Sequence, residues 1–234
     1  MTDRLKLPET RWGACAGHLI ISGCIFLLLF LVIALLLFPG ALFRVAGGID
    51  GIKIIAGVDL VLGPLLTLII YNKAKPRKEL YRDLAMIGTV QFAALFAGMF
   101  VVYESRPAVV TYVFDTFHTS KVAEFVKAKQ AVPELNLLTP KFYYLDLPED
   151  EQAAIAVLAQ YEMVGEQARL RSDLYLPLRG DKKALRGYLR VGSQSAAEVA
   201  DDCLLREVST PFVIEKLCFD AERFKFFSSQ GANP

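Results

Sequence analysis

The sequence predicts a membrane protein, in which three transmembrane helices are followed by an extracytoplasmic α+β domain. Two observations support this fold class. Apolar residues form three long runs, over residues 18–38, 52–71 and 84–103, and Asp59 is the only charged residue between residues 54 and 71. After residue 103 the chain has the mixed charge of an ordinary soluble domain. We therefore expect a cytoplasmic tail at residues 1–17, a membrane region at 18–103 and a periplasmic α+β domain at 104–234.

Each apolar run is long enough to cross a bilayer. An α-helix rises 1.5 Å per residue, so a hydrocarbon core of about 30 Å requires roughly twenty residues. The first run is also compatible with a signal peptide, because Arg4, Lys6 and Arg11 precede it. Its apolar stretch is too long for that role, and no cleavage site of small residues precedes residue 39. We expect this run to remain as a helix.

Lys and Arg residues predict the orientation, because short cytoplasmic loops carry an excess of them. The N-terminal tail is basic, whereas the loop after the first run contains Arg44, with Lys53 at the edge of the next helix. The loop after the second run is the most basic, with Lys73, Lys75, Arg77, Lys78 and Arg82. We expect a multi-pass membrane protein with a cytoplasmic N-terminus and a C-terminal domain on the outer side.

Asp59 is the residue of the membrane region that most needs an explanation. It lies about 10 Å below the outer edge of its helix. A lipid-facing carboxylate there costs at least about 2.5–3.5 kcal/mol, so we expect Asp59 to face the bundle, be protonated or reach water. Pro64 removes a backbone donor and frees a carbonyl group near Asp59. Gln91 of the third run lies at about the depth of Pro64, counted from the outer edge, and can donate a hydrogen bond to that carbonyl.

Three interpretations of Asp59 stay open. The first is a kinked helix that one polar bridge braces, and the second is a polar notch that binds a partner. The third is a proton relay, which needs a chain of titratable groups. In the sequence we find only Asp59 for such a chain, because His18 is expected at the cytoplasmic edge of the first run.

The outer domain reads as a mixture of strands and helices. Runs of β-branched and aromatic residues predict strands over residues 108–114, 142–147, 211–218 and 224–227. A helix is predicted to run to about residue 131, with His118, Thr119 and Ser120 as its N-terminal cap. Further helices are predicted over residues 148–163, 181–189 and 195–205.

Patterns of catalytic or metal-binding residues are missing from the sequence. It has two histidines, His18 and His118, and neither a phosphate-binding glycine loop nor a zinc-protease or serine-hydrolase motif. Glu149, Asp150 and Glu151 are better explained as a solvated charged face. The net charge of +1 gives no basic footprint for nucleic acid. We expect no catalytic residue, no metal and no cofactor.

Four cysteines are present. Cys15 and Cys24 belong to the first apolar run and are expected to pack as small apolar residues. Cys203 and Cys218 belong to the domain expected in the oxidising compartment, where a disulfide between them is predicted. Such a bridge closes a loop of about fifteen residues and contributes roughly 3 kcal/mol. Free thiols and a redox function are the alternatives.

Several motifs within residues 11–125 match a known family. They are Arg11-Trp12, His18, residues 38–43, Gly47-Gly48, residues 58–68 with Asp59, Gly63, Pro64 and Thr67, then Lys75, Gln91, Arg106-Pro107 and residues 113–117 with Asp115 and Phe117. On these motifs the chain resembles the type IV pilin accessory proteins of the TfpX/TfpZ family. Thr116 stands where that family usually has Arg, which puts in doubt any ion-pair role of this position.

The resemblance implies a multi-pass protein of the bacterial inner (cytoplasmic) membrane with a periplasmic C-terminal domain. It also implies a role in assembling or stabilising one particular type IV pilin. The helix bundle would hold the hydrophobic N-terminal helix of the pilin, the periplasmic domain would meet its head domain, and membrane lipid would be the other partner. The motif residues named above would form partner-binding or structural motifs of this assembly chaperone or modulator, which would not be an enzyme.

Two other functions stay open. A membrane-anchored thiol or transferase component acting on exported pilin would need a reactive Cys203 or Cys218, or paired carboxylates in a cleft. A ligand-sensing membrane anchor would need a cytoplasmic output domain, for which the short cytoplasmic segments leave little room.

Overall fold

The computed structural model describes residues 8–113, 116–145, 148, 150, 152–153, 156, 159, 165–178, 204–220 and 222–228. Contacts divide the chain into two compact units. Unit 1 comprises Met1–Val32 and Ile49–Tyr103, and unit 2 comprises Ile33–Gly48 and Glu104–Pro234. The loop between the first two apolar helices is therefore part of the same unit as the outer domain.

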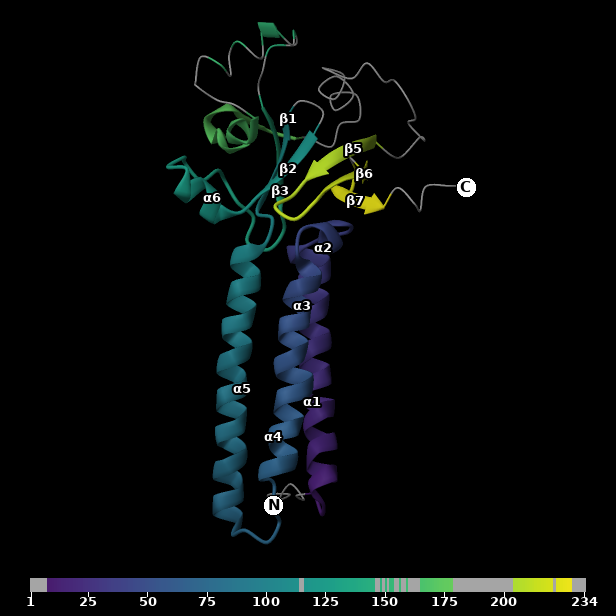
Figure 1. Cartoon of the computed structure of the whole chain (residues 1–234), viewed down its shortest axis with the longest axis vertical. Coiled ribbons are helices and arrows are strands. Elements are labelled where there is room, and N and C mark those ends of the chain that lie inside the picture. Colours follow the sequence, from purple (N-terminus) through teal and green to yellow (C-terminus); the bar gives the residue numbers. More distant parts are fainter. Residues whose placement is uncertain are drawn as a thin grey trace, which may run out of the picture. The chain divides into compact units, whose positions relative to one another are not determined.

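Three of the described helical stretches are long and apolar enough to cross a membrane: Arg11–Leu37, Gly48–Ile70 and Arg77–Ser105. The first consists of α1 (Arg11–Val32) and the π-helical turn η1 (Ile33–Leu37). The second consists of α3 (Gly48–Ala56), the π-helical turn η2 (Gly57–Leu62) and α4 (Gly63–Ile70), and the third is α5 (Arg77–Ser105) (Figure 1). Each helix begins earlier in the chain than the apolar run that predicts it.

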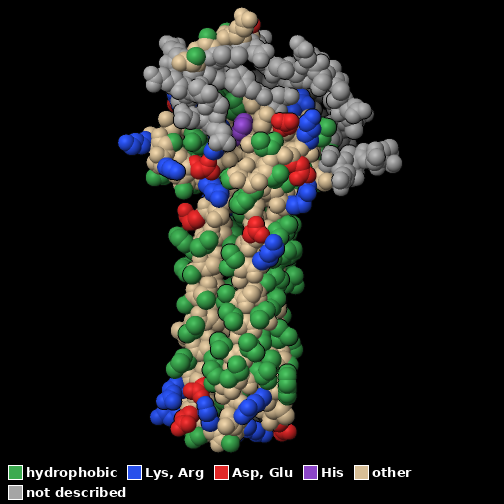
Figure 2. Space-filling model, in the orientation of Figure 1, with side chains coloured by type: hydrophobic (Ala, Val, Ile, Leu, Met, Phe, Trp, Pro, Cys, Tyr) green, Lys and Arg blue, Asp and Glu red, His purple; other side chains and the backbone are tan. Residues whose placement is uncertain are grey.

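Hydrophobic side chains cover the long helices, and Lys and Arg side chains gather at the end where the loop between α4 and α5 lies (Figure 2). Along α5, Phe92, Phe96 and Phe100 are 70%, 69% and 58% exposed. Their spacing of four residues places them on one face of the helix. Such a row of aromatic side chains is unfavourable in water and suits a hydrocarbon environment.

Pro64 accounts for the π-helical turn η2. Proline has no N–H group, so the carbonyl group of Leu60 cannot receive the regular helical hydrogen bond from residue 64. The N–H group of Gly63 donates instead to the carbonyl group of Val58, five residues earlier. A π-helical turn is rare and often marks a functional site. The sequence predicts a disrupted helix near Leu60, and the structure shows that disruption around Asp59.

In unit 2, the strands that the structure describes form one mixed sheet in the order β4-β3-β1-β2-β5-β6-β7 (Figure 1). The β1–β3 and β2–β5 pairs are parallel, and the other neighbours are antiparallel. The strands are β1 (Val109–Val113), β2 (Thr116–Ser120), β3 (Lys141–Leu145), β4 (Tyr175–Pro177), β5 (Leu204–Ser209), β6 (Ile214–Asp220) and β7 (Lys225–Ser228).

Two apolar clusters stabilise this sheet. Helix α6 (Val122–Lys127) and the 3-10 helix η3 (Gly165–Leu170) contribute to one of them, which consists of Ala108, Val109, Phe125, Tyr143 and Leu170. The other is aromatic, and its fully buried members Phe117, Phe219 and Phe226 have ring centroids 4.7 to 5.1 Å apart. A 3-10 turn, η4 (Ser172–Leu174), connects η3 to β4.

The loop between the first two apolar helices joins the edge of the sheet. Gly40 bridges to Phe226 of β7, and the N–H group of Ala41 donates to the Phe226 carbonyl oxygen at 2.7 Å. Gly40 has a φ of +67°, and a Cβ atom there would lie 2.4 Å from that oxygen, so only glycine fits. The short helix α2 (Leu42–Val45) follows, with Leu42 fully buried.

The structure confirms four predicted strands, as β1, β3, β6 and β7 within the described residues. The helix cap predicted at His118, Thr119 and Ser120 is wrong, because these residues belong to β2 and pair with β1. Helix α6 instead starts at Val122, where Glu124 accepts a hydrogen bond from the Lys121 N–H group at 3.1 Å. In the predicted helix at 148–163, the described Gln152, Ala153, Ala156 and Ala159 are helical.

The last two predicted helices fall mostly outside the described residues, which exclude 179–203. The end of the second one is wrong, because Leu204 and Leu205 begin strand β5. That strand pairs with both β2 and β6, and such long-range pairing overrides local helix propensity.

Candidate functional site

Asp59 and Gln91 form the centre of a polar cluster inside unit 1. The Asp59 side chain lies on η2 and is only 2% exposed. Gln91 of α5 donates from its Nε2 atom to Oδ1 of Asp59 at 2.8 Å, and the same Nε2 lies 3.4 Å from the main-chain oxygen of Asp59. Asp59 therefore faces the bundle, and Gln91 reaches both its carboxylate and its carbonyl group.

His18 and Thr67 extend this cluster to the other helices. The Oε1 atom of Gln91 lies 2.7 Å from Nε2 of His18 on α1. On the other side of the ring, Nδ1 of His18 lies 2.6 Å from the hydroxyl of Thr67 on α4, and that hydroxyl donates to the Gly63 carbonyl group at 3.1 Å. One chain of hydrogen bonds thus connects α1, η2, α4 and α5.

The direction of the hydrogen bonds follows from the groups that take part. An ionised carboxylate only accepts, so Gln91 turns its NH₂ group toward Asp59 and its oxygen toward His18. The amide oxygen accepts, so Nε2 of His18 carries a proton and donates. On the other side of the ring, the Thr67 hydroxyl lies within hydrogen-bonding distance of both Nδ1 of His18 and the Gly63 carbonyl oxygen.

Gly63 makes room for the cluster. A Cβ atom on Gly63 would lie 2.5 Å from both Nε2 and Oε1 of Gln91, well inside van der Waals contact. Ser22 of α1 completes the surroundings of the amide, with its Oγ atom 3.2 Å from Nε2 of Gln91. The second carboxylate oxygen of Asp59, Oδ2, is buried and has no hydrogen-bond partner among the described residues.

This arrangement can do two things chemically. It cross-links three apolar helices with hydrogen bonds, which are hard to replace where water is excluded. It also places an unsatisfied carboxylate oxygen inside the bundle. The proton-relay interpretation gains a second titratable group in His18, but the Gln91 amide keeps its own N–H protons and so separates His18 from Asp59.

The sequence did not identify His18 and Ser22 as members of this cluster. The sequence places His18 at the cytoplasmic edge of the first run; in the structure it lies on α1, seven residues after Arg11, where it contacts Gln91 and Thr67. A signal was present, since residues four apart in a helix share a face and Ser22 follows His18 at that spacing.

Three predicted motif residues of the outer domain, Arg106, Pro107 and Phe117, lie apart from this cluster in the chain and are core residues. Arg106 is 4% exposed, Pro107 is buried and Phe117 is fully buried in the aromatic cluster. Asp115 lies outside the described residues. The side chains of Arg106 and Phe117 therefore serve the packing of unit 2 and are not on its surface.

The cysteines fall into two groups. Cys15 and Cys24 are free thiols on α1. Cys218 of β6 is disulfide-bonded. Cys203, which the sequence predicts as its partner, lies outside the described residues, so the pairing stays a prediction.

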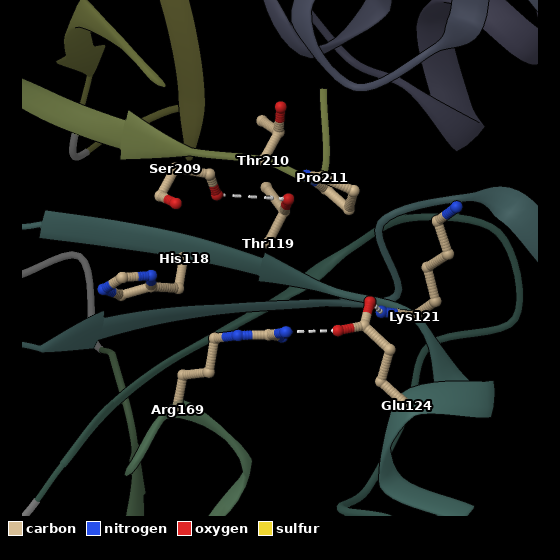
Figure 3. Close-up of a pocket in the computed structure, with 8 residues that line it drawn as sticks. All are labelled: His118, Thr119, Lys121, Glu124, Arg169, Ser209, Thr210 and Pro211. Atoms are coloured by element: carbon tan, nitrogen blue, oxygen red, sulfur yellow. Dashed lines mark hydrogen bonds and ion pairs between the residues drawn. The ribbon is translucent and has the colours of Figure 1, made fainter. Parts of the chain in front are cut away.

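A pocket of about 370 Å³ lies in unit 2 where β2 continues past the end of β5. Arg169 pairs with Glu124, and the Thr119 hydroxyl lies 3.4 Å from the Ser209 carbonyl oxygen (Figure 3). Arg169 also donates to the Ser120 hydroxyl at 2.6 Å. Because Arg169 is already paired, it organises the wall of the pocket and does not offer an unpaired cation. The lining residues are His118, Thr119, Lys121, Glu124, Arg169, Ser209, Thr210 and Pro211.

Within the described part of the chain, no three His, Cys, Asp or Glu side chains are grouped so that they could hold a metal ion. Tyr175 is the most perturbed titratable group described in unit 2. Burial raises its pKa above the ordinary value, and its hydroxyl accepts from the Thr111 hydroxyl at 3.1 Å and donates to the Arg169 carbonyl group. Since these contacts join β1, β4 and η3, Tyr175 is a structural residue.

Comparison with known proteins gives three relatives from Dichelobacter nodosus. The chain is 33% identical over 124 residues to its fimbrial assembly protein of serogroup E1, which is 49% of this chain and 48% of that protein. For the fimbrial assembly protein of serogroup I, the identity is 32% over 123 residues, with the same coverage. The chain thus spans about half the length of these two curated relatives.

The third relative is covered more completely. The chain is 35% identical over 103 residues to the fimbrial assembly protein of serogroups C1 and C2, which is 41% of this chain and 79% of that protein. No family model matches the chain. No solved structure matches it either.

Proposed function

Because the chain belongs to the family of the Dichelobacter nodosus fimbrial assembly proteins, we propose that it is an inner-membrane accessory protein of type IV pilus biogenesis. The observation that carries this proposal is the 35% identity over 79% of one such protein, together with three apolar helices of membrane-spanning length. Within that group, the motifs around Asp59 favour a pilin-specific accessory protein of the TfpX/TfpZ type.

The proposed orientation has a cytoplasmic N-terminus and a periplasmic unit 2. The basic loop between α4 and α5 supports it, since such loops remain on the cytoplasmic side. Alkaline phosphatase fused after Lys141 should be active, because the enzyme folds only outside the cytoplasm, and fused after Lys78 it should be inactive. The opposite pattern would place unit 2 in the cytoplasm and overturn the proposal.

The proposed partner is a pilin, whose hydrophobic helix would lie against the bundle while its head domain meets unit 2. The row of Phe92, Phe96 and Phe100 supports a contact on α5, because these three large side chains are exposed on one face. The polar cluster supports a fixed position for that face, since Gln91 ties α5 to α1 and η2. The Asp59 cluster would then brace the helices that present the aromatic row.

The proposed role is that of an assembly chaperone or modulator without catalytic activity. The disulfide of Cys218 favours this role over the thiol-component alternative, because a bonded sulfur is not a free nucleophile. The pairing of Arg169 with Glu124 likewise supports a structural role for this arginine in the wall of the pocket.

Deletion of the gene in its own host tests the proposal. We expect fewer surface pili, with pilin still synthesised, and restoration by a plasmid copy of the wild-type gene. A copy encoding Gly57→Ala is the matched control, because a Cβ atom at Gly57 would contact nothing within 4 Å. Unchanged surface piliation in the deletion strain would rule out the proposed function.

A further inference from the structure

The hairpin that joins β5 to β6 carries an unusual group of exposed apolar side chains. Phe212, Val213 and Ile214 are 58%, 41% and 66% exposed. Hairpin turns of soluble domains favour Gly, Asn, Asp and Ser, which tolerate water and special backbone angles. Phe212 and Val213 in the turn, followed by Ile214 as the first residue of β6, indicate a surface that contacts something other than water.

Direct contacts tie this tip to the loop between the first two apolar helices, within unit 2. The hydroxyl of Thr210 donates to the carbonyl group of Val45 at 2.8 Å. The ring of Phe212 lies against Gly47, where a Cβ atom would approach two ring carbons to 2.9 Å. Gly47 is followed by Gly48, the first residue of the second apolar helix. The tip therefore lies where the chain enters a membrane-spanning segment.

The register of the sheet is a second observation on the position of the β5–β6 hairpin. Strand β1 starts at Val109, shortly after α5 ends at Ser105. Val109 pairs with Ser120 at the end of β2, and β2 runs parallel to β5 with His118 opposite Ser209. The β5–β6 hairpin follows Ser209 directly, so it lies at the end of the sheet where the chain arrives from α5.

Basic side chains accompany the apolar tip. Lys121 lies over the ring of Phe212, with its Nζ atom 5.4 Å from the centroid. Arg44 of the adjoining loop pairs with Glu215, the residue after the tip, and remains half exposed. An aromatic and aliphatic tip with Lys and Arg beside it matches the chemistry of the bilayer interface, where apolar groups enter the acyl region and cations meet anionic headgroups.

We propose that Phe212, Val213 and Ile214 insert into the outer interface of the bilayer, so that the hairpin is a lipid-binding contact of unit 2. The inference rests on the proposed membrane location. It adds that unit 2 is held at the membrane surface by its own lipid contact, in addition to its covalent connections. A pilin head arriving at the membrane would then meet a domain whose distance from the lipid is fixed.

Tryptophan fluorescence tests this contact in the full-length protein. Trp12 is the single tryptophan of the chain, so Trp12→Phe provides a silent background. In that background, Ile214→Trp is reconstituted into phosphatidylcholine–phosphatidylglycerol vesicles with plain or brominated acyl chains. We expect strong quenching by the brominated lipid and weak quenching by aqueous acrylamide. Val213→Trp is a second reporter, should Ile214→Trp lower the yield.

Two control variants in the same background distinguish a missing hairpin–lipid contact from a protein that does not insert into the membrane. Leu176→Trp lies on β4, which three other strands separate from β5, and should respond to acrylamide but not to brominated lipid. Phe96→Trp lies on the exposed face of α5 and reports on insertion of the helices themselves. Quenching of Phe96→Trp without quenching of Ile214→Trp overturns the hairpin contact but leaves the membrane location standing.

The remaining outcomes are also decisive. If brominated lipid quenches neither Phe96→Trp nor Ile214→Trp, the proposed membrane location fails along with the hairpin contact. If Ile214→Trp is shielded from acrylamide without quenching by lipid, the tip contacts protein, and the lipid assignment is wrong.

Discussion

Gly63 and Gln91 show how a single missing methyl group shapes the polar cluster. In Gly63→Ala, the new Cβ atom would lie 2.5 Å from the amide atoms of Gln91, so the amide has to leave Asp59 or His18. We expect a loss of about 1–3 kcal/mol in the free energy of unfolding, the cost of a buried polar group without a partner. Thermal unfolding in detergent, followed by circular dichroism, measures this loss.

The matched control for that substitution is Gly57→Ala. A Cβ atom at Gly57 has no neighbour within 4 Å, although Gly57 belongs to the same helical stretch. Replacement of a helical glycine by alanine there should leave stability unchanged or raise it by up to about 1 kcal/mol. Equal stability of the Gly63→Ala and Gly57→Ala variants would show that the Gln91 amide is not held as described.

Asp59 permits a distinction between bracing and partner binding. Asp59→Asn keeps an oxygen that can accept from Gln91, so the protein should remain abundant in the membrane. Asp59→Leu removes that acceptor and should lower abundance, at a cost of about 1–3 kcal/mol. Immunoblots of membranes, read together with counts of surface pili, check both expectations.

Two outcomes would revise this account of Asp59. If both variants stay abundant but reduce surface pili, Asp59 acts in a partner-binding notch and not as a brace. If both variants keep normal abundance and normal piliation, neither interpretation of Asp59 holds.

The sequence predicts how far along its helix each polar residue lies. It predicts only in part which side chains point into the bundle. The sequence predicts that Asp59 faces the bundle, from the cost of a charge in lipid, and that Gln91 donates to the carbonyl group freed by Pro64. In the structure the Gln91 amide donates instead to the Asp59 carboxylate. The contribution of His18 was missed, because an apolar run does not reveal the polar first turns of a helix that begins at Arg11. Thr67 and Gly63 entered the candidate site through family motifs, and the contacts of their atoms required the structure.

Among the elements of unit 2, the contact of β1, β4 and η3 depends on the hydroxyl of Tyr175. Burial raises its pKa, so the folded state favours the neutral phenol. The unfolded chain ionises first, above about pH 10. The contribution of Tyr175 to the free energy of unfolding should therefore be constant below about pH 10 and be lost as the pH rises toward the higher pKa of this phenol in the folded state.

Tyr175→Phe tests this dependence. The variant should lose about 0.5–1.5 kcal/mol at neutral pH, because two hydrogen bonds of the hydroxyl disappear. Its stability should then fall less steeply with alkaline pH than that of the wild type, in denaturant titrations of the detergent-solubilised protein. Tyr81→Phe, at a half-exposed position on α5, is the control. Parallel alkaline profiles for the wild type and Tyr175→Phe would contradict the assignment.

Local sequence patterns predicted the strands with strong apolar character, but not the strands defined by distant partners. The sequences of β1, β3, β6 and β7 are rich in β-branched and aromatic residues, which suit a buried sheet. Strand β2 contains His118, Thr119 and Ser120, which resemble a helix cap in sequence. Its neighbour β5 lies far along the chain, and no local pattern shows that His118 pairs with Ser209.

For the whole molecule, the two units do not follow the simple order of a membrane region and then an outer domain. The loop between the first two apolar helices belongs to the same unit as the outer domain. The chain enters unit 2 at Ile33, returns to unit 1 at Ile49 and enters unit 2 again at Glu104. The bridge from Gly40 to Phe226 and the hydrogen bond from Thr210 to Val45 explain this, since both join the first loop to the outer domain. Each of the two chain segments of unit 2, Ile33–Gly48 and Glu104–Pro234, begins at the end of an apolar helix in the sequence.

Photo-crosslinking from α5 tests most directly whether this protein assists pilus assembly through its helices. Benzoylphenylalanine replaces Phe96, an exposed residue, or Ile87, which is 6% exposed, in cells that produce pilin. The account predicts that ultraviolet light yields a covalent adduct with pilin from position 96 and none from position 87. Adducts from position 96 that contain lipid or other membrane proteins, but never pilin, would contradict it.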